Sequence, residues 1–196
     1  MARRKNLLIG IIVGIAIVSA SVYATGLSER LLTPFFGSST TYKTLGSANA
    51  PALATGDWIN SEPLKLNDLQ GRVVLIEFWT FGCINCRNTL PFIKGWHDRY
   101  GDKGLTVVGV HSPEFDEERD VEKVRSEVGS LGIRYPVVTD NAYQTWNAYN
   151  VEAWPTMFLL DKQGRIRWKH VGEGNYDEAE ELIQKLLAEK GDQLMN

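Results

Sequence analysis

The only two cysteines of the chain, Cys83 and Cys86, are separated by two residues. They follow an almost continuous apolar segment, Val73–Trp79, which predicts a strand buried on both faces of a sheet. The residues that come next, 84–100, are typical of a helix that is interrupted by a kink at Pro91. A pair of thiols between a buried strand and a helix indicates thiol–disulfide chemistry.

The positions of the two thiols predict different roles. At the N-terminus of a helix, unpaired backbone N–H groups and the positive end of the helix dipole favour the thiolate of Cys83. Cys86 lies one turn into the helix and is expected to be more covered. We therefore expect Cys83 to attack a partner's sulfur atom and Cys86 to resolve the mixed disulfide that forms.

Two structural explanations of the cysteine pair are weaker. A disulfide that closes so short a loop stabilises a fold by about 2 kcal/mol, against about 4.7 kcal/mol for a loop of about a hundred residues. A zinc site needs two more ligands, and the three histidines, His97, His111 and His170, are widely scattered in the sequence. The pair favours redox chemistry, and we expect no metal.

The remaining hydrophobic pattern predicts an α/β fold with a mixed sheet. A second buried strand is expected over Leu105–Val110, an amphipathic helix over Glu117–Leu131 and a short helix over Ala142–Tyr149. Two strands, Thr156–Leu160 and Arg165–Val171, are expected to form a hairpin. A final amphipathic helix, 177–190, closes a chain that combines parallel β-α-β units with an antiparallel pair.

Composition limits the organisation and the function of the chain. Its 196 residues, 43% of them hydrophobic, suffice for one domain with a core, which we assign to residues 51–196. This domain is expected to begin with a small β-hairpin formed by residues 58–60 and 64–66. Residues 25–50, rich in Ser, Thr, Gly and Ala, predict a flexible linker. A net charge of −3 and a pI of about 5.7 exclude a basic nucleic-acid binder.

Residues 1–24 predict a signal peptide or an N-terminal membrane anchor. The basic residues Arg3 to Lys5 precede an uncharged apolar segment, 7–24. As a helix this segment reaches ~27 Å, close to the thickness of a bilayer core, which favours an anchor. Residues 22–24 nevertheless offer a small-residue cleavage site. Both alternatives place the domain outside the cytoplasm, in the periplasm, either anchored to the inner membrane or secreted.

Four motifs resemble those of a known family. The strand end Glu77–Trp79, the cysteine pair, Pro91 and the segment Trp154–Thr156 occur in the order found in thioredoxin-fold proteins. The resemblance covers about residues 51–187 and is closest to the membrane-associated TlpA/ResA-like and DipZ-type thioredoxin domains. It implies a three-layer sandwich in which helices flank a mixed sheet.

The resemblance also implies roles for single residues. Pro155 matches the cis-proline that faces the active-site cysteines, and Trp154 before it would help to bind an extended substrate segment. Glu77 matches the buried acidic residue beneath the second cysteine, where it would relay a proton to or from Cys86. Gly172 matches a glycine that lets the substrate backbone approach.

Some positions depart from the family pattern. Thr89 stands where ResA-like proteins usually carry a glutamate, and Trp154 is bulkier than the residue usual in thioredoxin. The dipeptide Ile84-Asn85 between the cysteines matches neither reducing thioredoxin nor a strong oxidant. These residues leave the redox direction open, and we take reduction as the expected direction.

The expected function is extracytoplasmic thiol–disulfide exchange with exported proteins, without a cofactor. The family implies a membrane thiol relay as the electron donor and cytochrome c maturation as a client pathway. Two alternatives use the same thiols. Thr80 and Cys83 resemble the T-x-x-C pattern of thiol-dependent peroxidases, although no proline precedes Thr80 at the needed spacing. A copper-binding chaperone would hold Cu(I) with Cys83, Cys86 and a distant histidine.

Polar residues also follow the second predicted strand. His111 and Glu114 are expected on a solvated loop at the same sheet edge as Cys83, with a groove-lining role as the alternative. The acidic residues 114–122 are expected to be a solvated helix N-terminus.

Overall fold

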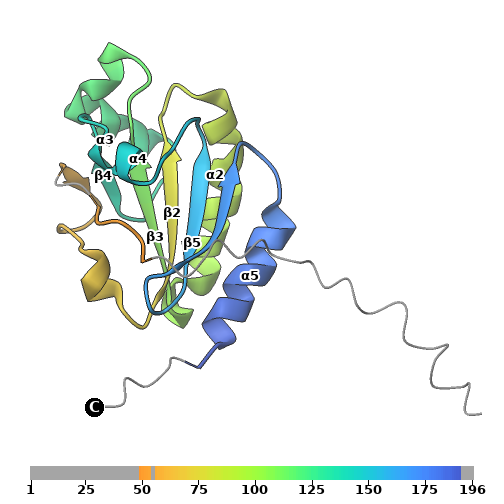
Figure 1. Cartoon of the computed structure of the whole chain (residues 1–196). Coiled ribbons are helices and arrows are strands. Elements are labelled where there is room, and N and C mark those ends of the chain that lie inside the picture. Colours follow the sequence, from red (N-terminus) through yellow and green to blue (C-terminus); the bar gives the residue numbers. More distant parts are fainter. Residues whose placement is uncertain (1–48, 54–55, 191–196) are drawn as a thin grey trace, which may run out of the picture. The chain divides into compact units, whose positions relative to one another are not determined.

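The computed structural model of the chain describes residues 49–53 and 56–190. In this part of the chain, six strands form one mixed sheet in the order β1-β4-β3-β2-β5-β6 (Figure 1). The strands are β1 (Trp58–Ile59), β2 (Val73–Trp79), β3 (Leu105–His111), β4 (Val137–Thr139), β5 (Thr156–Leu160) and β6 (Ile166–Val171). The helices are α2 (Ile84–Tyr100), α3 (Val121–Ser130), α4 (Gln144–Ala148) and α5 (Tyr176–Ala188), with short 3₁₀ turns η1 (Leu66–Leu69), η2 (Gly101–Lys103) and η3 (Asp116–Arg119). The predicted α/β class and mixed sheet are confirmed.

The central strand β2 positions the candidate site. All of its residues are buried, and it pairs in parallel with β3 and antiparallel with β5. Side chains alternate between the two faces of a strand. Ile76 and Phe78 therefore point into one apolar cluster, whereas Glu77 and Trp79 point to the opposite face. Glu77 contacts Thr89 of α2, so this second face is the one that carries the cysteine helix.

Helices cover both faces of the sheet. On one face α2 and α5 lie side by side, because Trp96 and Tyr100 of α2 both donate hydrogen bonds to Glu180 of α5, at 3.1 and 2.6 Å (Figure 1). On the other face, Trp146 of α4 and Trp58 of the N-terminal segment pack against the apolar cluster that contains Phe78. The domain has the three layers that the family resemblance implies.

The predicted N-terminal β-hairpin is wrong. Trp58 of β1 lies opposite Val138 in an antiparallel pairing with β4, which is far away in the sequence. The expected second strand is absent from its position, since residues 66–69 form the turn η1. Leu64 and Leu66 pack against the apolar cluster instead. Burial of these side chains, together with pairing of the exposed edge of β4, is favoured over a local hairpin.

Two further elements differ from the sequence prediction. The pattern misses β4, whose three residues are too few to show a period. The helix predicted from Glu117 begins only at Val121, because the Asp120 carboxylate caps it by accepting hydrogen bonds from the N–H groups of Glu122 and Lys123 at 3.0 and 3.3 Å. The preceding residues form the separate turn η3.

The described residues do not include the predicted N-terminal segment. Among residues 49–53 and 56–190, none of the helices has the length and apolar character that a membrane span requires. Residues 1–24 and nearly all of the predicted linker 25–50 lie outside the described residues. The signal peptide or anchor therefore stays a prediction.

The cap of α3 gives a test of this local structure. Asp120→Ala should lower the free energy of unfolding by about 1 kcal/mol, because two backbone N–H groups lose their acceptor. Urea denaturation measures this change, and the exposed neighbour Glu117→Ala is the matched control. Equal effects of the two substitutions would contradict the capping role.

Candidate dithiol site

The candidate site lies at the sheet edge where the parallel strands β2, β3 and β4 end. The Ser112 N–H after β3 donates to the Trp79 carbonyl oxygen at the end of β2, at 3.1 Å. Strand β5 runs antiparallel to β2 and therefore begins at this same edge, directly after Pro155. The topology thus brings the residues that precede Cys83 together with the segment Trp154–Pro155, which is distant in the sequence.

Cys83 is the N-cap residue of α2. Its Sγ atom accepts a hydrogen bond from the Cys86 N–H at 3.2 Å. Backbone donors at a helix N-terminus stabilise a sulfur atom that carries negative charge. Cys83 is half-buried, Cys86 is fully buried, and both are free thiols. The difference in exposure is the one that an attacking and a resolving thiol require.

The Cys86 thiol is hard to ionise where it lies. Burial raises the pKa of Cys86 far above its usual range, and the hydrogen bond with Cys83 raises it further. A thiol of this kind does not become a nucleophile unless a nearby group takes its proton.

Glu77 is a group that can take a proton inside the domain. Its carboxyl is fully buried, and burial raises its pKa to about 7, although hydrogen bonds from Tyr135 and Thr89 act in the opposite direction. Tyr135 donates to Oε2 at 2.9 Å and Thr89 to Oε1 at 3.4 Å. The charge of Glu77 also raises the pKa of Cys86, which couples the two groups. Near neutral pH the carboxyl is therefore able to bind or release a proton.

Tyr135 is a site residue that the sequence reasoning missed. It is fully buried just before β4, and its ring occupies space beside Gly109, the residue opposite Glu77 on β3. A Cβ at Gly109 would lie 3.2 Å from the Tyr135 ring and 2.9 Å from Nε1 of Trp79. Glycine at this position makes room for the two aromatic rings. No local pattern in the sequence links Tyr135 to Glu77.

The Trp154–Pro155 peptide bond is cis, as the family resemblance implies. The Trp154 indole donates a hydrogen bond to the Ser112 carbonyl oxygen at 3.0 Å. Its ring also lies against the ring of Trp146, with centroids 4.3 Å apart. Trp154 is half-buried, so it is fixed in place while part of its surface remains accessible.

Gly172 lies beside the cis bond. Its N–H donates to the Pro155 carbonyl oxygen at 2.8 Å. The φ angle of Gly172 is +88°, in the left-handed region, and an added Cβ would meet nothing within 4 Å. The left-handed backbone conformation is sufficient to explain why a glycine occupies this position. No other part of the described chain comes close to the place where a side chain would begin.

Two expectations about the polar residues after β3 are wrong. His111 belongs to β3 and is fully buried instead of lying on a solvated loop, and its ring stacks on Phe81 with centroids 5.5 Å apart. Burial lowers the pKa of His111 to about 4, so the ring is neutral at pH 7. In the acidic segment, Glu114 is exposed as expected, but Glu118 is only 1% exposed. Long-range contacts, which the sequence pattern does not show, cover both side chains.

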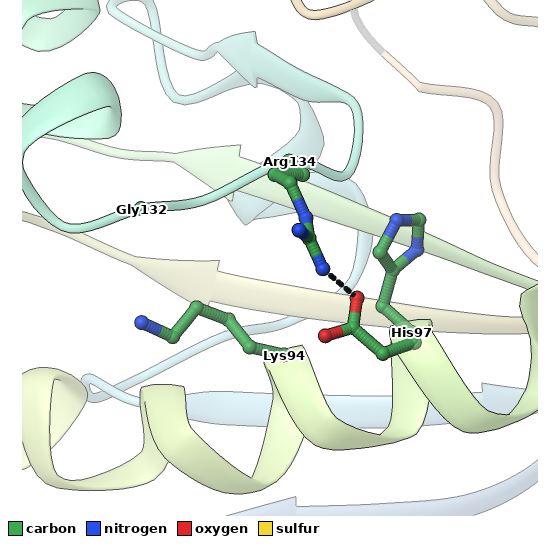
Figure 2. A pocket seen from close by; sticks show the side chains of 5 residues that line it. Lys94, His97, Gly132 and Arg134 are labelled. Atoms are coloured by element: carbon green, nitrogen blue, oxygen red, sulfur yellow. Dashed lines mark hydrogen bonds and ion pairs between the residues drawn. The ribbon is translucent and has the colours of Figure 1, made fainter.

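A polar pocket lies between α2 and the segment before β4, lined by Lys94, His97, Asp98, Gly132 and Arg134 (Figure 2). Arg134 pairs with Asp98 at 2.5 Å, and the Lys94 ammonium group donates to the Leu131 carbonyl oxygen at 2.8 Å. The pocket contains none of the site residues predicted from the sequence.

The copper-binding alternative needs a third ligand near the two thiols. Among the residues that the structure describes, no three His, Cys, Asp or Glu side chains are grouped so that they could hold a metal ion. His111, one of the candidate ligands, has its ring packed against Phe81 and Trp79.

The mixed sheet, the cysteine pair at the N-terminus of α2 and the cis-proline define a thioredoxin-fold protein with a dithiol site. Residues 47–169 match the model of the AhpC/TSA family, and the chain belongs to this family. The likeness to TlpA/ResA-like and DipZ-type domains is also confirmed by the relatives that follow.

The chain is 42% identical over 133 residues to Protein DipZ of Mycobacterium tuberculosis, a match that covers 66% of this chain and 19% of that protein. It therefore spans about a fifth of the length of DipZ. It is 27% identical over 137 residues to thiol-disulfide oxidoreductase ResA of Bacillus anthracis, covering 70% of this chain and 76% of that protein. Among solved structures, a thiol-disulfide isomerase of Corynebacterium glutamicum matches with a TM-score of 0.66 and 30% identity, over 72% of this chain and 99% of that one.

The burial of Glu77 makes the stability of the domain depend on pH. The carboxyl has a pKa of about 7 in the folded state and 4.5 as its ordinary value. Between these values the folded state binds more protons than the unfolded state, so stability falls as the pH rises. The loss amounts to about 3 kcal/mol above pH 7. Glu77→Gln should therefore raise the free energy of unfolding at pH 8 and change it much less at pH 4.5.

Urea denaturation at the two pH values measures this effect. Glu117→Gln, which removes an exposed carboxylate from the same domain, is the matched control. If the difference between Glu77→Gln and the unsubstituted protein were the same at both pH values, the raised pKa of Glu77 would be refuted.

Proposed function

We propose that the chain is an extracytoplasmic thiol–disulfide oxidoreductase that reduces disulfides of exported proteins. The observation that carries the proposal is the position of Cys83, an accessible N-cap thiol hydrogen-bonded to the N–H of the buried Cys86. The names of two relatives, thiol-disulfide oxidoreductase ResA and thiol-disulfide isomerase, support the same class of reaction.

The first step is attack by the Cys83 thiolate on one sulfur atom of the partner's disulfide. A bond forms between Cys83 and that sulfur atom, and the partner's other sulfur atom leaves as a thiolate. The helix N-terminus stabilises the attacking anion.

In the second step Cys86 transfers its proton to the Glu77 carboxylate and attacks the Sγ atom of Cys83. The mixed disulfide breaks, the partner's second sulfur atom leaves as a thiolate, and the chain keeps a Cys83–Cys86 disulfide. Both partner thiolates then take up protons from the solvent. Two electrons have passed to the partner, so a dithiol donor must reduce the chain again. A membrane thiol relay is the donor that we propose.

The partner is proposed to bind as an extended segment at the cis-proline. Trp154 offers an apolar surface that Ser112 and Trp146 hold in place. Ile84, directly after Cys83, is 67% exposed and adds a second apolar contact. The partners that we propose are exported proteins with a disulfide in an accessible segment, including substrates of cytochrome c maturation.

The compartment is proposed from the sequence of residues 1–24. A basic start followed by an apolar segment directs the rest of a chain across a membrane, either as a cleaved signal or as an anchor. The reducing direction is proposed from the resemblance to ResA-like reductases.

Trapping of mixed disulfides tests the roles of the two thiols. In Cys86→Ser, Cys83 should accumulate covalent complexes with disulfide-containing exported proteins, because the resolving thiol is missing. Cys83→Ser should accumulate none. Non-reducing gel electrophoresis of the full chain measures both, and equal trapping by the two variants would overturn the assignment.

The same preparations separate the alternatives. Consumption of hydrogen peroxide at a catalytic rate would support a peroxidase in place of the proposed function. Copper that survives washing with a chelator and is lost in Cys83→Ser would support a copper chaperone.

The pH dependence of resolution tests the proton acceptor. Glu77 must be ionised to take the Cys86 proton, so the resolution rate should rise through pH about 7 and then level off. Glu77→Gln should lower the rate roughly 100-fold and remove this dependence. Tyr135→Phe should move the midpoint to higher pH, because the lost hydrogen bond stabilised the carboxylate.

Rapid mixing of the chain with a disulfide substrate, followed by acid quenching, gives the rate of the second step alone. A resolution rate that has the same pH profile in all three proteins would exclude Glu77 as the proton acceptor. Unchanged attack by Cys83 in each variant is the internal control.

A further inference from the structure

Glu118 lies in an acidic turn but is removed from solvent. Its neighbours Asp116 and Glu117 are exposed, whereas Glu118 is 1% exposed. Its Oε2 atom accepts hydrogen bonds from the N–H groups of Glu114 and Phe115, at 2.6 and 3.2 Å. Its Oε1 atom accepts a hydrogen bond from the Gly82 N–H at 3.1 Å. Gly82 directly precedes Cys83, so one carboxylate joins the segment after β3 to the segment that carries the candidate nucleophile.

The fit between Glu118 and Gly82 is tight. A Cβ atom at Gly82 would lie 2.4 Å from Oε1 of Glu118, closer than two non-bonded atoms can approach. The φ angle of Gly82 is outside the left-handed region, so its backbone conformation does not require glycine. A side chain at position 82 would therefore displace the Glu118 carboxylate from the Gly82 N–H.

The contacts keep Glu118 ionised. Burial opposes the charge, but hydrogen bonds from the Thr80 hydroxyl and from the backbone of Glu114, Phe115 and Gly82 hold the pKa of this carboxyl below its usual range. An ionised acceptor makes stronger hydrogen bonds to backbone N–H groups than a neutral one.

Every residue between β2 and Cys83 is held by the segment that contains β3 and η3. Thr80 contacts Nε2 of His111 at 3.3 Å, Phe81 stacks on the same ring, and Gly82 is bound by Glu118. Each of the three residues of this short connection therefore has one contact with that segment.

We propose that Glu118 is a positioning residue for Cys83, which fixes the backbone before the thiol so that the sulfur atom meets a partner's disulfide in line. The inference rests on the proposed function, in which Cys83 is the attacking thiol. Thiol–disulfide exchange needs three sulfur atoms in a defined geometry, and small displacements of a reacting group cost large factors in rate.

A purely local role would leave Cys83 unaffected. The Phe115 N–H at the start of η3 donates to Glu118, and this local cap needs only Oε2. The contact of Oε1 with Gly82 crosses 36 positions of the sequence and contributes nothing to that cap. A local cap predicts a change in stability alone, whereas positioning predicts a change in the reactivity of Cys83.

The test uses the full chain with Cys86→Ser, so that only the first step is observed. The second-order rate constant for reaction of Cys83 with 5,5′-dithiobis(2-nitrobenzoate) is measured by absorbance. Glu118→Ala should lower it roughly 10- to 100-fold. Glu117→Ala, which removes an exposed carboxylate one position away, should change it by less than about twofold. Near-UV circular dichroism confirms that each variant is folded.

A double-mutant cycle with Gly82→Ala makes the test specific. Gly82→Ala alone should slow Cys83, because the new Cβ displaces the carboxylate. In the Glu118→Ala background that space is free, so adding Gly82→Ala should cause little further loss. If Glu118→Ala does not fold, Glu118→Gln takes its place, since it keeps one oxygen acceptor and removes the charge.

The outcomes separate the two proposals. Positioning by Glu118 is supported if Cys83 reacts slowly in both single variants and the double variant is about as slow as Glu118→Ala alone. A Glu118 variant that reacts at the rate of its parent, or losses that multiply, overturns it. If the parent Cys86→Ser protein itself did not react, the proposed function would fail independently of Glu118.

Discussion

Glu77 lies in the centre of the sheet with no exposure to solvent, and the chemistry of the site follows from how its proton is accommodated. A carboxyl in such a place is unfavourable for folding, because its charged form loses hydration. Hydrogen bonds from Tyr135 and Thr89 offset part of this cost. The remaining rise of the pKa to about 7 lets the group bind a proton near neutral pH, which is what the proposed transfer from Cys86 requires and what an apolar residue at this position cannot do.

Two thiols three positions apart acquire opposite properties from their surroundings. Cys83 is at the N-cap, half-exposed and hydrogen-bonded by a backbone N–H group. Cys86 is buried, and its raised pKa means that it keeps its proton. The sheet topology maintains this difference, because the ends of β2 and β3 and the start of β5 meet at one edge. At this edge Glu118 accepts a hydrogen bond from Gly82, the residue before Cys83, and Trp154 donates one to Ser112 after β3.

Local sequence patterns predict the parts of this structure that local forces determine. The apolar segment before the cysteines forms β2, and the residues after them form α2, as expected. The turn before Arg165 joins β5 and β6, also as expected. The pattern fails where a distant partner decides the outcome. One case is β1, which pairs with the distant strand β4. Tyr135 and Glu118 are two more, because no sequence motif marks them and their contacts with Glu77 and Gly82 are long-range. Of the site, the thiols, Glu77 and the cis-proline were accessible through a motif, whereas the residues that hold them were not.

The central claim is that Glu77 exchanges a proton near neutral pH beneath the buried thiol. The most direct measurement is an NMR titration of the reduced domain in which the side-chain carboxyl carbon of Glu77 is labelled with ¹³C and assigned with Glu77→Gln. Its chemical shift should change with a midpoint near pH 7. A midpoint near 4.5, the ordinary value of a glutamate, would contradict it.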